Sequence, residues 1–145
     1  MDETPNPTVV NASERVFQLS DFALDYQLGT VKATGSTADP ILILQYGDER
    51  KLIRLIGPDL EVSVQVALEN ILKQNPPADA YALAYDARLP YGGEKFDAVV
   101  AEVADIEDRV AKRFAQRYRH KKSLFGTFEL VGPPMYLGVT KERRF

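Results

Sequence analysis

The 145-residue sequence has no cysteine and only one histidine, His120. Without cysteine the chain has no disulfide, no thiolate nucleophile and no cysteine-ligated zinc or iron–sulfur site. With one histidine, any metal site that needs two imidazoles is excluded, and Ser–His–Asp catalysis would have to run through His120. Cations flank this residue on both sides, a setting typical of a surface histidine rather than a catalytic base.

The sequence also has no phosphate-binding glycine loop and no long hydrophobic run. Its glycines lack the spacing that lets backbone amides hold a phosphate. The longest apolar run, Ile41–Leu44, is far shorter than the ~18–20 residues that span a bilayer. The first residues are acidic and contain proline, so we expect no signal peptide. We therefore predict a cytoplasmic protein with no cofactor, no bound metal and no membrane partner.

The composition that remains is that of one soluble domain. Hydrophobic residues make up 45% of the chain and charged residues 27%, which is ordinary for a globular protein. We predict a flexible segment over residues 1–13 and a single α+β domain over residues 14–145. The formal net charge of −3 counts against a dedicated nucleic-acid binder.

The first half of the domain predicts strands and one main helix. Apolar residues alternate over 22–28, which is the period of a half-buried strand. Two β-rich runs around the polar turn at 47–50 predict a hairpin over 41–56. Asp59 can cap a helix over 59–74, which its apolar spacing supports and a proline pair ends.

Residues 97–119 allow two interpretations. Their apolar residues fall at helical spacing without glycine or proline, which predicts a second long helix over 97–119. They are also rich in β-branched residues, and they follow a strand-like segment and a Gly-Gly turn, which predicts a meander over 80–119. We favour the meander. A strand over 124–131 follows, and Gly132-Pro133-Pro134 is expected to end it. The predicted fold is a mostly antiparallel sheet packed on the helix over 59–74.

Two stretches resemble segments of small bacterial proteins: YALAYDARL at 81–89 and FAQRYR at 114–119. The resemblance names no family and carries over no function or site residue. It favours the meander.

The strongest functional pattern is a run of cations interleaved with aromatic residues. Residues 112–122 hold six of the 18 Lys and Arg residues and no acid. Just upstream, residues 102–108 hold four acids. Segregated charge of this kind suits a salt-bridged contact within the protein or with a partner. The same cations and aromatics could contact phosphates and unpaired bases.

From this pattern we predict a non-enzymatic protein-interaction module of the bacterial accessory, regulatory or immunity type. It would bind an unidentified protein partner or a second copy of itself, a homodimer. In the meander the arginines of the run share one strand face, and the aromatics point to the core. A nucleic-acid-binding module using residues 112–122 is the first alternative. The predicted partner-binding residues are four cations and an apolar pair: Arg113, Arg117, Arg119, Lys121, Met135 and Tyr136.

A metal-dependent hydrolase or nuclease is the second alternative. Asp86, Glu94 and Asp97 come near one another if the meander forms, and carboxylates on paired strands could hold Mg²⁺. Lys95 would complete a nuclease-like set. Because a solvated acidic surface explains the same residues, we assign no catalytic residue.

Overall fold

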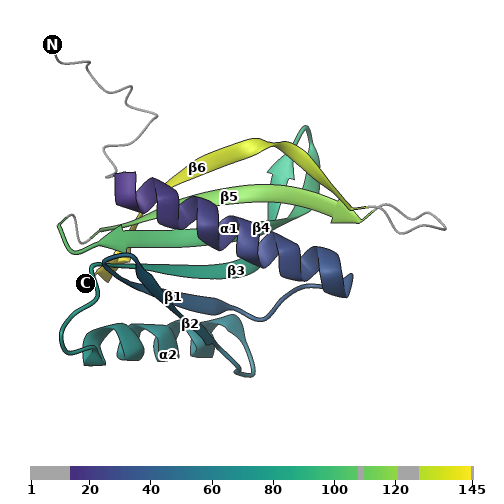
Figure 1. The fold of residues 1–145 in the computed structure, drawn as a ribbon. Coiled ribbons are helices and arrows are strands. Elements are labelled where there is room, and N and C mark those ends of the chain that lie inside the picture. Colours follow the sequence, from purple (N-terminus) through teal and green to yellow (C-terminus); the bar gives the residue numbers. More distant parts are fainter. Residues whose placement is uncertain (1–13, 108–109, 121–127, 145) are drawn as a thin grey trace, which may run out of the picture.

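The computed structural model describes residues 14–107, 110–120 and 128–144, with side chains described as far as residue 140. The predicted flexible segment over 1–13 and the predicted binding residue Lys121 lie outside the described residues. Figure 1 shows the described elements arranged as one sheet with a helix on each side. They are two helices, α1 (Glu14–Thr34) and α2 (Leu60–Lys73), and six strands, β1 (Ile41–Tyr46), β2 (Glu49–Arg54), β3 (Ala80–Tyr91), β4 (Glu94–Asp105), β5 (Val110–His120) and β6 (Phe128–Arg144).

The six strands form one antiparallel sheet in the order β2-β1-β3-β4-β5-β6. The predicted α+β fold, the hairpin over 41–56 and the meander over 80–119 are confirmed. The alternative of a long helix over 97–119 is wrong, since β4 and β5 occupy that segment. The β-branched valines of this segment suit a strand that is buried on both faces. Val99 and Val103 face one side of β4, and Val100 faces the other.

Helix α1 covers one face of the sheet. The predicted strand over 22–28 is wrong, because the buried residues of α1 recur at spacings of three and four rather than two. Leu19 and Ala23 on the helix pack with Ala82 and Ala101 on β3 and β4, all of them fully buried. Small side chains on the sheet allow the helix axis to lie close to the strands.

Helix α2 covers part of the opposite face. Asp59 caps it as predicted, because its carboxylate accepts a hydrogen bond of 2.9 Å from the Val62 amide. Ala67 and Ile71 pack against Leu42 and the neighbouring apolar residues of β3. The sheet therefore packs on the helix over 59–74, as predicted, and α1 is a second helix that the prediction lacked. Among the described residues no helix is long and apolar enough to cross a membrane.

Strand β6 runs through the predicted break at Gly132-Pro133-Pro134. The prediction of a break is wrong because β6 is an edge strand. Proline has no backbone N–H, and on an edge strand no neighbouring strand on the outer side depends on that missing donor. The register of β6 with β5 also shifts at three places, which accommodates the irregular segment. Gly132 takes a positive φ of 70° at this irregularity. The first part of the predicted strand over 124–131 lies outside the described residues.

Candidate functional site

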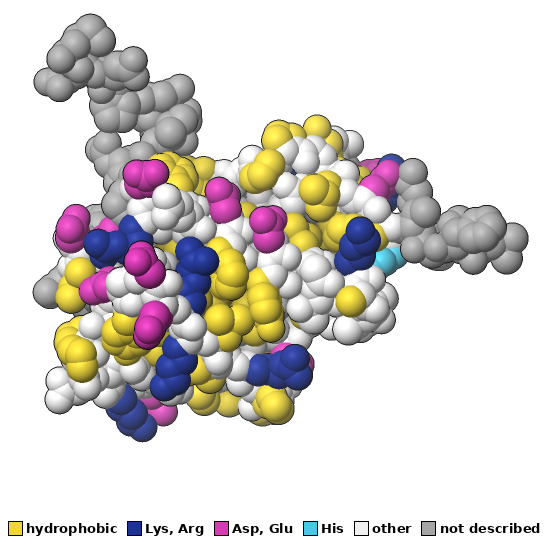
Figure 2. All heavy atoms as spheres, viewed as in Figure 1, with side chains coloured by type: hydrophobic (Ala, Val, Ile, Leu, Met, Phe, Trp, Pro, Cys, Tyr) yellow, Lys and Arg dark blue, Asp and Glu magenta, His cyan; other side chains and the backbone are white. Residues whose placement is uncertain are grey.

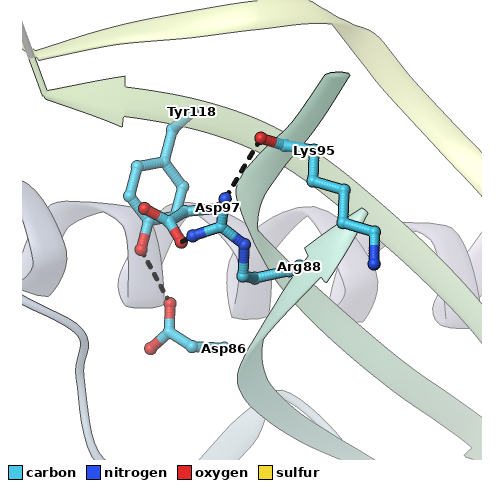
Figure 3. A network of polar contacts seen from close by, with 5 residues as sticks. All are labelled: Asp86, Arg88, Lys95, Asp97 and Tyr118. Carbon is cyan, nitrogen blue, oxygen red and sulfur yellow. Dashed lines mark hydrogen bonds and ion pairs between the residues drawn. The ribbon is translucent and has the colours of Figure 1, made fainter. Parts of the chain in front are cut away.

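A partly buried carboxylate, Asp86, lies on the α1 side of β3, where the side chains of Ala82 and Ala84 also point. Its Oδ2 accepts a hydrogen bond of 2.8 Å from the Ala38 amide. Its Oδ1 accepts one of 3.0 Å from the hydroxyl of Tyr118, which reaches it from β5 (Figure 3). The carboxylate thus ties the segment after α1 to two strands of the sheet.

The surroundings of this pair raise the pKa of both groups. Burial raises the pKa of Asp86, the two hydrogen bonds oppose that rise, and the charge of Asp97 adds to it. Burial also raises the pKa of Tyr118, and the negative charge of Asp86 raises it further. The raised pKa keeps the proton on the Tyr118 hydroxyl, which therefore donates to Asp86.

Replacing Asp86 by Asn should change how stability depends on pH. The folded-state pKa of Asp86 is raised, so the folded protein binds the proton more tightly than the unfolded chain, and this favourable contribution is lost as pH rises from about 4 through the folded value. An amide keeps an acceptor for Ala38 without the charge. The stability of Asp86→Asn relative to wild type should therefore increase with pH across that window and then level off. Urea denaturation at several pH values measures it, with exposed Asp48→Asn as the control. A flat difference would contradict this account of Asp86.

Next to this pair, the exposed Arg88 of β3 lies across from Asp97 of β4. Its guanidinium approaches the Asp97 carboxylate to 3.4 Å and donates a hydrogen bond of 3.2 Å to the Lys95 carbonyl, whereas the Lys95 side chain points away (Figure 3). Asp86 and Asp97 share a strand face, whereas Glu94 alternates to the other face. In the part of the chain that the structure describes, no three His, Asp or Glu side chains are placed to hold a metal ion.

A cleft of about 360 Å³ opens beside Asp86. The loop that follows α1 forms one wall, the segment that leads into α2 forms the second, and β3 forms the third. Apolar side chains line part of it, among them Leu55, Leu60 and Tyr85. Its lining also includes three carboxylates and no Lys or Arg, so its electrostatic field favours a cation.

The central cation of the predicted binding run, Arg117, is buried, with 4% of its surface exposed. Its guanidinium stacks over the Tyr91 ring at 4.0 Å and donates hydrogen bonds to the carbonyls of Pro90 and Val131 at 3.3 and 3.4 Å. It also contacts the Met135 sulfur at 3.0 Å. Pro90 belongs to β3, which β4 separates from β5 in the sheet, so the tip of the β3–β4 hairpin folds over the face that carries Arg117.

The other predicted binding residues are divided between the interior and the surface. Arg113 is half-buried opposite the buried Glu102 of β4. Arg119 is exposed and pairs with Glu129 of β6. The Tyr136 ring packs against Phe114 at 5.5 Å, beside the core under α1. The structure therefore gathers these residues on and around β5 and β6 and commits most of them to contacts within the protein.

Comparisons with protein-family models, curated proteins and solved structures find no match to this chain. The interpretation of the site therefore depends on its geometry alone.

Three further charged residues are buried although their burial was not predicted from the sequence: Glu102, Asp105 and Lys112. Glu102 is fully buried on β4, where its carboxylate accepts a hydrogen bond of 3.1 Å from the Tyr85 hydroxyl. Lys112 is buried on β5, and that burial lowers its pKa, which the charge of Asp105 partly restores. The sequence does show these charged residues within apolar strand segments. That pattern does not distinguish a buried charged side chain from an exposed one.

An apolar surface patch surrounds the N-terminal half of α2. It consists of residues whose exposed fractions range from 39% to 84%, and Figure 2 shows exposed apolar side chains over α2 and the segment before it. Val62 lies against Gly57: a Cβ atom added to Gly57 would be 3.3 Å from the Val62 side chain. The segment before the helix is therefore continuous with this surface. We call these residues the α2 patch: Ile56, Leu60, Val62 and Val66.

Proposed function

We propose that the protein is a non-enzymatic module that binds another protein, and that the α2 patch forms part of the contact surface. The exposure of the patch is the observation that supports this function. Helix α2 buries only a narrow stripe that includes Ala67 and Ile71, and it leaves Ile56 84% exposed beside it. Val62 and Val66 lie one helical turn apart on α2, and Val62 lies against Gly57, next to Ile56. Exposed apolar side chains gathered on one segment are typical of interaction surfaces.

The charged run contributes less to this proposal than the sequence suggested. Lys112 and Arg117 are buried, Arg113 is half-buried, and Arg119 pairs with Glu129. These four cations of the run are buried, half-buried or paired, whereas Lys121 and Lys122 lie outside the described residues. Because the four described cations present little free positive charge, we do not propose nucleic-acid binding. Arg119 remains available at the surface as a contributor to a protein contact, and its role there is a prediction.

Site-specific photo-crosslinking tests the proposed function. A photoreactive amino acid at position 62, in the α2 patch, should yield a covalent adduct with a partner in cells of the source organism. The same amino acid at exposed position 25, on α1, serves as the matched control. Ile56→Asp should reduce the adduct from position 62 by about fivefold or more, since a charge at the centre of an apolar contact weakens it. An adduct pattern that is the same at both positions, or absent at both, would overturn the proposal.

A further inference from the structure

The cleft of about 360 Å³ beside Asp86 carries negative charge that the described part of the protein does not neutralise. Its three carboxylates are those of Asp39, Asp59 and Asp86. Among the described residues no Lys, Arg or His forms an ion pair with any of them. One oxygen of Asp59 and both oxygens of Asp86 accept hydrogen bonds within the protein, but a carboxylate oxygen can accept a second one. The cleft therefore keeps acceptor sites for a cationic ligand.

A second observation at the cleft, the hydroxyl group of Ser63, points to a ligand independently of the charge. Ser63 lies on α2, only 3% of its surface is exposed, and it lines the cleft. Within the described part of the chain no group forms a hydrogen bond with this hydroxyl. A nearly buried polar group without a partner is costly, and a hydrogen bond from a bound ligand would remove that cost.

The local backbone leaves the Ser63 hydroxyl open toward the cleft. A Cβ atom added to Gly57 would be 3.3 Å from the Ser63 Oγ, so Gly57 is the nearest neighbour on that side. Gly57 lines the same cleft and has no side chain that could cover the hydroxyl. The hydroxyl is therefore within reach of a small molecule in the cleft.

The arrangement of the carboxylates favours an organic cation over a metal ion. No three His, Asp or Glu side chains of the described residues are placed to hold a metal ion, so the three carboxylates of the cleft do not converge on one point. An ammonium group has three donors that point in different directions. Leu55 and Leu60 add apolar surface to the lining, and the volume falls within the range of about 300–1,000 Å³ that is typical of small-molecule sites.

We propose that the cleft binds a small organic cation, a primary amine with a short hydrocarbon chain. The ammonium group lies among the three carboxylates and donates a hydrogen bond to the Ser63 hydroxyl. The hydrocarbon chain packs against Leu55 and Leu60. This small-molecule site goes beyond the proposed protein contact and does not depend on it, although both include Leu60.

Protein NMR with three small molecules tests the inference. Pentylamine, pentanol and pentanoate have similar hydrocarbon chains and carry a positive charge, no charge and a negative charge at neutral pH. Pentylamine at millimolar concentration should shift the amide signals of Ala38, Gly57 and Ser63 and bind at least about tenfold more tightly than pentanol, whereas pentanoate should shift none of them. Equal binding of pentylamine and pentanol, or no shift of these amides with pentylamine, would overturn the inference.

Magnesium chloride distinguishes a site shaped for an amine from a general attraction of positive charge. Mg²⁺ carries twice the charge of pentylammonium, so a surface that acted through charge alone would attract it more strongly. We expect Mg²⁺ at the same concentration to leave the three amide signals unchanged. Shifts as large as those from pentylamine would mean that the cleft attracts any cation, and the inference would fail.

Substitutions in the cleft identify the groups that hold the amine. Asp39→Asn removes one charge and keeps the backbone carbonyl that accepts from Gln27, and it should weaken pentylamine binding by about threefold to tenfold. Ser63→Ala removes the hydroxyl with little change in volume and should weaken binding by about threefold. Asp48→Asn, at the exposed turn beyond the other end of β1, is the matched control and should leave the affinity within about twofold. An unchanged affinity in either cleft variant, or an equal loss in the control, would contradict the proposed site.

Discussion

Replacing Arg117 by Ala should destabilise the protein by about 2–3 kcal/mol. The substitution removes the hydrogen bonds to the carbonyls of Pro90 and Val131 and the stack on Tyr91, and it leaves a gap beside Met135. Part of this loss of stability is offset, because removing the guanidinium also removes the cost of burying its charge. Among the described residues no carboxylate pairs with Arg117 to reduce that cost. Since the contacts link β5 to the tip of β3, amide hydrogen exchange should increase most at residues 90–95.

Arg119→Ala is the matched control for this prediction. Arg119 lies two residues further along β5 on the same strand face, but its side chain is 54% exposed and pairs with Glu129 at the surface. Its loss should change the free energy of unfolding by no more than about 0.5 kcal/mol. Urea denaturation of both variants measures the difference. Equal effects of the two substitutions would mean that Arg117 does not hold the hairpin tip in place.

Replacing Leu19 by Ala should cost about 2–5 kcal/mol, the range observed when a large aliphatic side chain is removed from a packed core. Leu19 is fully buried between α1 and the sheet, in the same cluster as Ala82 and Ala101. Helix α1 is one long rigid element, so the surrounding side chains have little freedom to close the cavity. Thermal or urea denaturation with the native state followed by circular dichroism measures the loss.

Leu72→Ala on α2 is the control for the core substitution. The residue type and the change are the same and both positions are helical, but Leu72 is 73% exposed. Its loss should change stability by no more than about 0.5 kcal/mol. A large cost at Leu72, or a small one at Leu19, would contradict the packing of the two helices described above.

The binding run illustrates how far sequence reasoning reaches into the site. The alternation of Arg113, Arg117 and Arg119 with the aromatics was predicted from the two-residue period of a strand, and the structure has the same arrangement. The prediction assumed that the face opposite the aromatics was open to solvent. In the structure the tip of the β3–β4 hairpin covers that face at Arg117. A strand pattern states which side chains share a face, and it carries no information on what a distant hairpin places over it.

The misassigned first element has a different cause. Over residues 22–28 the large apolar side chains alternate, and this favoured a strand. The buried set of α1 also includes Ala23 and Gln27, and with them the spacing becomes that of a helix. A small residue and a polar one bury against the sheet because the alanines of β3 leave room and because the Gln27 side chain donates a hydrogen bond to the Asp39 carbonyl. Both reasons depend on partners far along the chain or outside the helix.

Local chemistry in the sequence was sufficient to predict the β1–β2 hairpin, the capped helix α2 and the meander from β3 to β5. Each of these depends on turn residues, a cap or a period that operates over a few neighbouring positions. Only the tertiary structure decided that Arg117 is a buried contact, that Asp86 meets Tyr118, and that β3 extends past β1 to form the acidic cleft. These features arise where segments distant in sequence meet, and their energies depend on burial and on the lengths of paired strands, which no local pattern encodes.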